Sequence, residues 1–183
     1  MTEKLQEKLT SPKDYNSPDE LLAIVDEHDT ECGCAPRKLL HTLKLFHRAV
    51  HVLVYLSPQE ILLQRRSIHK DTFPLHWECV GGHVGPGESY EETALREVEE
   101  ELGVRASELT FLTKIPASEH TGHEFICVYK AIITDKPHPN DQEIDRLHIV
   151  TEADLRTLDE NPVVAPLSPI FLHTLKQLGF AKR

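Results

Sequence analysis

A dense glycine cluster followed by a strongly helical stretch is the feature that most constrains the fold of this chain. Four glycines lie between positions 81 and 87, and residues 90–102 (YEETALREVEEEL) are rich in good helix formers. Gly103 follows this stretch directly. Glycine after a helix commonly ends it, because glycine adopts the left-handed conformation without strain. The sequence therefore predicts a glycine-rich loop followed by one helix over residues 90–102.

The predicted helix has an acidic face. Glu97, Glu100 and Glu101 have the spacing i, i+3 and i+4, which places their carboxylates on one side of about two turns. Like charges this close repel each other, so the arrangement is stable mainly when a cation lies among them. The opposite side is expected to pack on a sheet through three apolar residues, Leu95, Val98 and Leu102.

The residues around this face favour a divalent metal and an anionic ligand. Mg2+ and Mn2+ prefer carboxylate oxygens, and Mg2+ keeps waters that phosphate oxygens can replace. Arg96 can hold a neighbouring carboxylate with its planar guanidinium. The glycine loop, including Gly81, allows the backbone to approach a phosphate, which the positive end of the following helix attracts. The pattern therefore predicts a metal-dependent site for a diphosphate.

The spacing of these residues resembles the Nudix box. Gly82 is followed after five residues by Glu88, and after seven more by the run REVEEELGV at residues 96–104, so that every fixed position is filled. In Nudix hydrolases this motif binds divalent ions and directs water onto a diphosphate that links a nucleoside to another group. The resemblance implies a metal-dependent diphosphate hydrolase with Mg2+ or Mn2+ as cofactor.

The same resemblance implies roles for residues of the box. Metal ligands are expected at four positions, Glu97, Glu100, Glu101 and the main-chain carbonyl of Gly82. Catalytic roles are expected for Glu97, Glu100, Arg96 and Glu88, the last two orienting the glutamate cluster. The general base stays open between one of these glutamates and a glutamate outside the box.

Outside the box, the chain is similar to the Nudix branch related to isopentenyl-diphosphate isomerase. The shared stretches are DELLAIVDE, FHRAVHV and LLQRRSIHKD, together with Trp77 and the pair Gly82-His83, and the likeness covers about residues 20–180. In those isomerases a metal site uses histidines and a glutamate. The resemblance implies a second candidate metal site here, at His47, His83, Glu124 and, with a spacing one residue short, His41. It also implies that Arg66 and Lys70 contact the diphosphate, as their charge supports.

Two departures count against isomerase activity. The catalytic cysteine of the isomerases would lie where this chain has Gly81, and Cys79 is two residues away. The isomerases also lack a complete hydrolase box, whereas this box is intact. We therefore expect hydrolysis of a diphosphate linkage in a nucleoside-diphosphate-type substrate. An isopentenyl-diphosphate isomerase and a ligand-sensing Nudix domain without turnover stay open as alternatives.

The remaining pattern predicts an α/β (α+β) fold, a Nudix-like α/β/α sandwich with a central mixed sheet. Residues 1–18 are expected to be a polar tail, and residues 19–183 a single domain that contains the box at 82–104. Strands are predicted over 49–56, 61–66, 109–115, 124–133 and 147–150. Further helices are expected from Pro36, from Thr151, and over 168–179.

Composition restricts the partners. With 20 Lys and Arg against 30 Asp and Glu, the net charge of -10 argues against nucleic acid, so we expect a small-molecule diphosphate substrate. The sequence has neither a long apolar run nor a signal-like start, which predicts a cytoplasmic protein with no membrane partner. The four cysteines are expected to be reduced thiols. The oligomeric state stays open between monomer and homodimer.

Two weaker signals have more than one interpretation. His120 and His123 lie in a polar stretch between two predicted strands, where they either contact substrate or belong to a plain hairpin loop. Trp77 either stacks on a base or packs in the core, and a single tryptophan in a strand favours packing.

Overall fold

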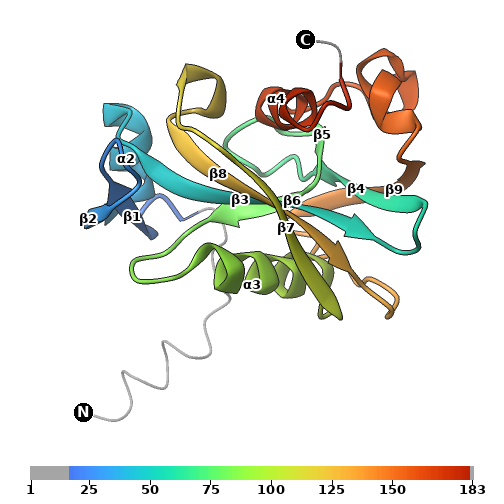
Figure 1. The fold of residues 1–183 in the computed structure, drawn as a ribbon, viewed down its shortest axis with the longest axis horizontal. Helices are drawn as coiled ribbons and strands as arrows, with labels where there is room; N and C mark the ends of the chain where they lie inside the picture. The colour runs from blue at the N-terminus through green and yellow to red at the C-terminus, as the bar shows by residue number, and fades with distance from the viewer. Residues whose placement is uncertain (1–16, 182–183) are drawn as a thin grey trace.

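Strand β3 (His47–Tyr55) is the centre of the sheet in the computed structural model, which describes residues 17–181 (Figure 1). Its side chains Val50, Val52 and Leu53 are all buried, as expected for a strand that is covered on both faces. It runs parallel to β8 (Glu124–Ile132) and antiparallel to β4 (Glu60–Arg66) and β6 (Val80–His83). The central sheet is therefore mixed, as the sequence predicts.

The other strands extend this sheet at its ends. A hairpin of β1 (Leu21–Val25) and β2 (Glu31–Pro36) joins β3 through β1. Strand β7 (Glu108–Ile115) pairs with β8. Two strands pair with β4, and these are β5 (Trp77–Glu78) and β9 (Ile144–Thr151).

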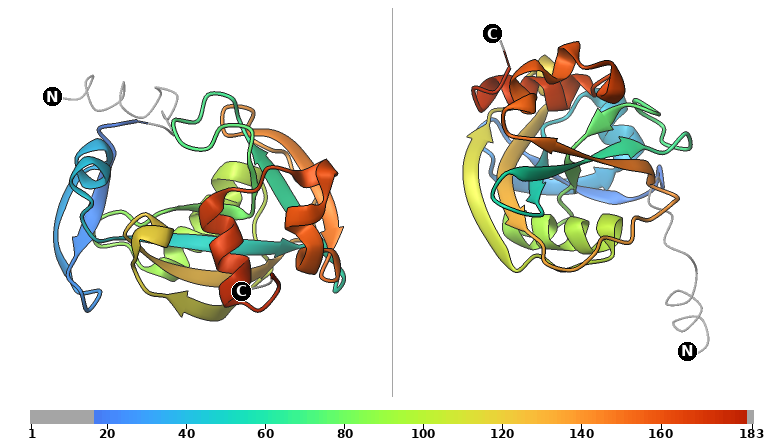
Figure 2. Two further views of the ribbon diagram at one scale, coloured as in Figure 1. Left: turned by 90° about the horizontal axis from the view of Figure 1, so that it is seen from above. Right: turned by 90° about the vertical axis from the view of Figure 1, so that its right-hand side faces the viewer.

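Helices cover both sides of the sheet. Figures 1 and 2 show α3 (Tyr90–Leu102) on one side and α4 (Pro169–Gln177) on the other, while α2 (Arg37–Leu43) lies beside the β1–β2 hairpin. Short 3-10 helices complete the described elements, η1 (Glu119–Thr121), η2 (Asp154–Glu160) and η3 (Pro162–Val164). This arrangement confirms the expected fold class.

Two main hydrophobic clusters hold the layers together. One lies between α3 and the sheet, where Val98 and Leu102 pack near Val50 and Val52. The other lies beneath α4 and includes Leu53, Phe171 and Leu175. The sheet is thus anchored on both faces, and the site described below uses residues from both sides.

Two details of the predicted helices are wrong. Leu95 is 40% exposed, because it lies at the edge of the stripe Ala94, Val98 and Leu102 through which α3 packs, about 100° around the helix from Ala94. The segment expected as a helix from Thr151 forms a 3-10 helix that starts at Asp154, where the Thr151 hydroxyl accepts a hydrogen bond from the Asp154 amide at 3.2 Å. It does not continue as an α-helix, because Thr157 has a non-helical φ of -129°.

Most of the expected polar tail, residues 1–16, lies outside the described residues. Within residues 17–181, no helix has both the length and the apolar character needed to cross a bilayer.

Candidate functional site

Helix α3 is fixed at both ends by residues that its sequence provides. Ser89 accepts a hydrogen bond from the amide of Glu92, and the Glu92 carboxylate accepts one from the amide of Ser89. At the other end, Gly103 has a φ of 65°, and its amide donates to the carbonyl of Glu99. These caps stabilise the helix whose acidic face lies beside β6.

Gly82 allows the helix and strand β6 to approach each other closely. A Cβ atom added at this position would lie 2.1 Å from Oε1 of Glu97. The neighbouring amide of Gly81 donates to Oε2 of Glu101 at 3.3 Å. The glycine pair therefore lets the backbone of β6 line the glutamate cluster, in the place where the sequence predicts a carbonyl ligand.

Arg96 connects the glutamates of the box to one another. Its guanidinium donates to Glu88 at 2.8 and 3.1 Å, to Glu97 at 2.7 Å and to Glu100 at 3.1 Å. It also donates to the carbonyl of His83 at 3.1 Å. Although burial opposes ionisation of Glu88, its hydrogen bonds from Arg96 and the Gly85 amide lower its pKa. Arg96 and Glu88 therefore form the charged frame around the cluster.

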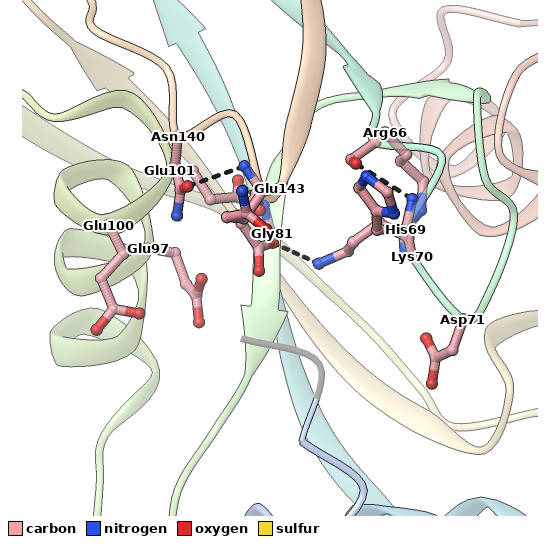
Figure 3. A network of polar contacts seen from close by, with 12 residues as sticks. Arg66, His69, Lys70, Asp71, Gly81, Glu97, Glu100, Glu101, Asn140 and Glu143 are labelled. Carbon is pink, nitrogen blue, oxygen red and sulfur yellow. Dashed lines mark hydrogen bonds and ion pairs between the residues drawn. The ribbon is translucent and has the colours of Figure 1, made fainter. Parts of the chain in front are cut away.

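Glu97 and Glu101 are carboxylates with too little positive charge around them. Burial raises the pKa of Glu97 to about 7, with a further contribution from Glu100, even though Arg96 acts in the opposite direction. Burial and the nearby Glu97 raise the pKa of Glu101 well above its usual range. Figure 3 shows both side chains pointing from α3 toward Glu143, with Glu100 one turn away. A bound cation would reverse these shifts by stabilising the ionised carboxylates.

Two unpaired oxygen atoms support the fit to a hard metal. Oε1 of Gln64 and Oε1 of Glu143 are buried and accept no hydrogen bond from the described residues. The Gln64 amide donates to Glu101 at 2.8 Å, so this side chain belongs to the same group. A set of carboxylate, amide and main-chain oxygens is the chemistry that Mg2+ and Mn2+ prefer.

Glu143 is the residue that the sequence reasoning did not identify. It lies just before β9, is 5% exposed, and forms an ion pair with Lys70 through its other oxygen. Its surrounding sequence, NDQEID, has no recognisable motif. The sequence allows the general base to be a glutamate outside the box, but it does not indicate which glutamate.

Arg66 and Lys70, expected to contact a diphosphate, line the same cavity but already have carboxylate partners. Arg66 pairs with Glu78 and also donates to the carbonyl of Thr72 at 2.9 Å. Lys70 points across the site toward Glu143 (Figure 3). Both cations are therefore held in place at the edge of the glutamate cluster.

The candidate second metal site is assembled from four separate elements. His41 on α2, His47 on β3, His83 on β6 and Glu124 on β8 each offer a ligand atom, and these atoms lie within 4.8 Å of one another. His41 belongs to the cluster despite its shorter spacing in the sequence. Register explains the rest, because His47 pairs with Glu124 in the parallel β3–β8 ladder.

The pKa values of two histidines of this cluster, His41 and His83, are lowered, chiefly by burial. Burial and the neighbouring His83 and His47 lower the pKa of His41 to about 4. Although burial opposes ionisation, hydrogen bonds with His47 and His83 keep the pKa of Glu124 well below its usual range. The Nε2 atom of His41 is buried and makes no hydrogen bond to the described residues, and Nε2 of His47 lies 3.5 Å from Oε1 of Glu124. Imidazole nitrogens together with a carboxylate are ligands that suit a transition metal.

One cavity of about 960 Å3 joins the two clusters. It is lined by Glu97 and Glu100 on one part of its wall and by His41, His83 and Glu124 on another. Gly82 and His83 are consecutive, so strand β6 connects the two sites. The structure therefore brings most of the predicted site residues onto a single cavity wall. The exceptions are Glu88 and the buried Glu101 and His47, and each of these three contacts a residue of that wall.

Other residues of interest in the sequence lie outside the two clusters. Trp77 is 3% exposed and packs in the cluster beneath α4, so the core interpretation holds. Cys32 and Cys34 are exposed thiols on β2. His120 and His123 line the cavity.

Comparison with known proteins identifies the family of this chain. The model of the NUDIX domain family matches residues 45–170, which is more than half of the chain. An uncharacterized Nudix hydrolase of Streptomyces coelicolor is 37% identical over 145 residues, covering 76% of this chain and 79% of that protein. An isopentenyl-diphosphate Delta-isomerase of Paenarthrobacter aurescens is 35% identical over 133 residues, covering 68% and 72%.

The fold also matches solved structures. The crystal structure of DR0079 from Deinococcus radiodurans superimposes with a TM-score of 0.73 at 26% sequence identity, covering 87% of this chain and 99% of that one. The family match, the complete box and this structural likeness all indicate the same protein family. The chain belongs to the Nudix hydrolase family, whose enzymes generally use divalent metals to hydrolyse phosphorus-containing anhydrides.

Proposed function

We propose that this protein hydrolyses the diphosphate linkage of a small nucleoside-diphosphate-type substrate, with Mg2+ or Mn2+ held by Glu97, Glu100, Glu101 and the carbonyl of Gly82. The observation that carries the proposal is the close approach of Glu97 and Glu101 to strand β6, where burial raises the pKa of both carboxylates. When bound, the metal supplies positive charge that activates water and neutralises charge on the phosphoryl oxygens.

The chain's own residues would do the rest of the chemistry. Arg66 and Lys70 line the cavity and provide positive charge for the diphosphate oxygens. Arg96 holds Glu97 and Glu100 in position, and Glu88 holds Arg96. In the reaction a bond forms between the water oxygen and phosphorus, the bond from phosphorus to the bridging oxygen breaks, and the leaving phosphate takes the electron pair.

Glu143 is our candidate for the general base that takes the proton from the water. Its Oε1 is buried and accepts no hydrogen bond from the described residues, while Lys70 holds its other oxygen. It also lines the cavity. A base that is positioned in this way contributes about 10²–10⁴-fold to the rate. Glu143→Gln should therefore lower kcat by that factor with little change in KM.

Isopentenyl-diphosphate isomerisation is the second candidate, and the histidine cluster is the observation that favours it. The position of the missing cysteine argues against it. A Cβ atom at Gly81 would lie 2.7 Å from the carbonyl oxygen of Val50 and 3.1 Å from Cδ2 of His51, so the backbone leaves no room for a side chain there. Cys79 is buried, and burial raises the pKa of its thiol well above the usual value.

The test is a product screen on a panel of nucleoside diphosphate derivatives and isopentenyl diphosphate, with Mg2+ and with Mn2+. Hydrolysis of one panel member by the wild type, lost in Glu100→Gln/Glu101→Gln, supports the proposed function and identifies the substrate class. Conversion of isopentenyl diphosphate with no nucleotide hydrolysis would replace it by the isomerase. Binding of panel members with no turnover of any would favour the ligand-sensing alternative.

A further inference from the structure

The cations that line the cavity fall into two groups, which differ in whether a carboxylate neutralises them. Four of them have a partner within 4.0 Å: Arg37 with Asp71, Arg66 with Glu78, Lys70 with Glu143, and Arg96 with the box glutamates. Lys44 and Lys176 line the same cavity, and neither has a carboxylate within that distance among residues 17–181. Lys44 and Lys176 are therefore the cavity-lining lysines that form no ion pair within the described residues.

A stacked pair of histidines lies next to Lys176. The rings of His120 on η1 and His173 on α4 stack, with centroids 5.5 Å apart and an angle of 19° between their planes. Lys176 is close enough to His173 to lower its pKa, together with burial and His120. We call Lys44, His120, His123, His173 and Lys176 the basic rim.

The basic rim is continuous along three neighbouring segments. The loop after α2 contacts the start of β8, because the amide of His47 donates to the carbonyl of His123 and the ring of Phe46 lies 6.2 Å from that of His123. Helix η1 precedes β8 and contacts α4 through the stacked imidazoles. One carboxylate, Glu119, adjoins His120 on η1. The rim thus combines three histidines with two lysines that form no ion pair within residues 17–181.

The rim and the glutamate cluster lie far apart in the fold. Figures 1 and 2 show η1 and α4 on the opposite side of the sheet from α3, which carries Glu97 and Glu100. The cavity of about 960 Å3 that joins them is at the upper end of the range of about 300–1,000 Å3 for drug-sized ligands. Its size suits a substrate that is much larger than a five-carbon diphosphate.

We propose that the basic rim binds a second anionic group of the substrate, a phosphate monoester separate from the diphosphate that is cut. Lysine ammonium groups and imidazoles are donors that bind phosphate oxygens, and the unpaired state of Lys44 and Lys176 leaves them free to do so. This inference rests on the proposed function for its scissile diphosphate. It narrows the substrate class to nucleoside diphosphate derivatives that carry an additional phosphate.

The test compares two probes that differ by one phosphate monoester, coenzyme A and 3′-dephospho-coenzyme A. Their binding to the full-length protein is measured by calorimetry without added divalent metal, so that the metal-dependent reaction does not consume them. The wild type should bind coenzyme A at least about tenfold more tightly, which corresponds to about 1.4 kcal/mol. Lys44→Ala and Lys176→Ala should each reduce this ratio, and the double variant should abolish it.

Lys136→Ala is the matched control, because Lys136 is an exposed lysine outside the cavity lining, and it should leave the ratio unchanged. Equal affinity for the two probes, no measurable binding of either, or a ratio that survives in Lys44→Ala/Lys176→Ala would overturn the proposal. Turnover with Mg2+ is then measured separately. A phosphate preference in binding without hydrolysis of any probe would support the rim and contradict the proposed hydrolase function.

Discussion

The glutamate cluster and the histidine cluster share one cavity but are built in opposite ways. The glutamates come from a single helix and are placed by its 3.6-residue period, with Arg96 and Gly82 as close neighbours. The histidine cluster collects one residue each from α2, β3, β6 and β8. The arrangement of the glutamates therefore requires only that α3 packs on the sheet. The arrangement of the histidine cluster requires the correct register of several strands.

Their electrostatics differ in the same way. Among the glutamates, burial leaves two carboxylates with raised pKa values, which a hard divalent cation would lower. In the histidine cluster, burial lowers the pKa of His41 and His83, and hydrogen bonds with His47 and His83 lower the pKa of Glu124 despite its burial. We therefore expect catalysis of hydrolysis to depend on the glutamates and to tolerate changes in the histidines.

The largest effect should come from the glutamates themselves. Glu100→Gln and Glu101→Gln should each lower kcat/KM for hydrolysis at least about hundredfold, because each removes charge from the metal site. Glu99→Gln is the matched control: it lies on the exposed side of the same helix, where it pairs with Arg105. Steady-state kinetics with Mg2+ check this prediction. An equal loss of kcat/KM in all three variants would mean that the total charge of the helix, and not the metal site, determines activity.

Gly82→Ala should separate activity from stability. The added Cβ would meet the flexible end of Glu97, so the fold can adjust while the carboxylate moves by the order of 1 Å. Such a displacement can cost about hundredfold in rate. We expect kcat to fall about tenfold to hundredfold with an almost unchanged Tm.

Gly33→Ala controls for the loss of a glycine in a strand, because its Cβ would meet nothing within 4 Å. Calorimetric unfolding gives the Tm of both variants, and steady-state kinetics give their kcat. A Gly82→Ala protein of full activity would mean that the close approach of β6 to Glu97 has no catalytic importance.

His51 should sharpen the comparison through the pH dependence of stability. It is half-buried on β3 and its Nδ1 lies 2.8 Å from Oγ1 of Thr174, and burial lowers its pKa in the folded state. A lowered pKa means that the unfolded chain binds the proton more tightly, so stability is lost as the pH falls below the unfolded-state value of about 6.5. His51→Gln should reduce the loss of unfolding free energy between pH 7 and pH 5, measured by urea titration. An identical pH dependence in variant and wild type would contradict this role.

The smallest effect is expected at Cys79. The thiol is buried and its pKa is raised, so it is a poor nucleophile. Cys79→Ala should keep kcat/KM for hydrolysis within about threefold of the wild type, with a modest fall in Tm from the lost packing. Complete loss of activity in a folded Cys79→Ala protein would favour cysteine chemistry and count against the glutamate-based mechanism.

The same contrast explains what the sequence could predict. The box and the mixed sheet follow from local spacing and composition, so the helix over residues 90–102 and its end at Gly103 can be placed without coordinates, whereas the N-cap at Ser89 comes from the structure. The histidines are grouped only through resemblance, since no local rule brings His41 beside His83. Leu95 differs from the prediction because the spacing of three apolar residues does not show where the packed stripe ends. Glu143 and the basic rim depend on loops that join distant strands, for which the sequence offers no periodic signal.

The central claim is that the glutamates, and not the histidines, carry the hydrolysis. The most direct test measures hydrolysis of the substrate found in the screen by two double variants, Glu100→Gln/Glu101→Gln and His47→Gln/His83→Gln, with metal binding followed by calorimetry. We predict at least about hundredfold loss of kcat/KM in the glutamate variant, and a change within about threefold in the histidine variant. Loss of hydrolysis in the folded histidine variant, with activity retained in the glutamate variant, would contradict the account.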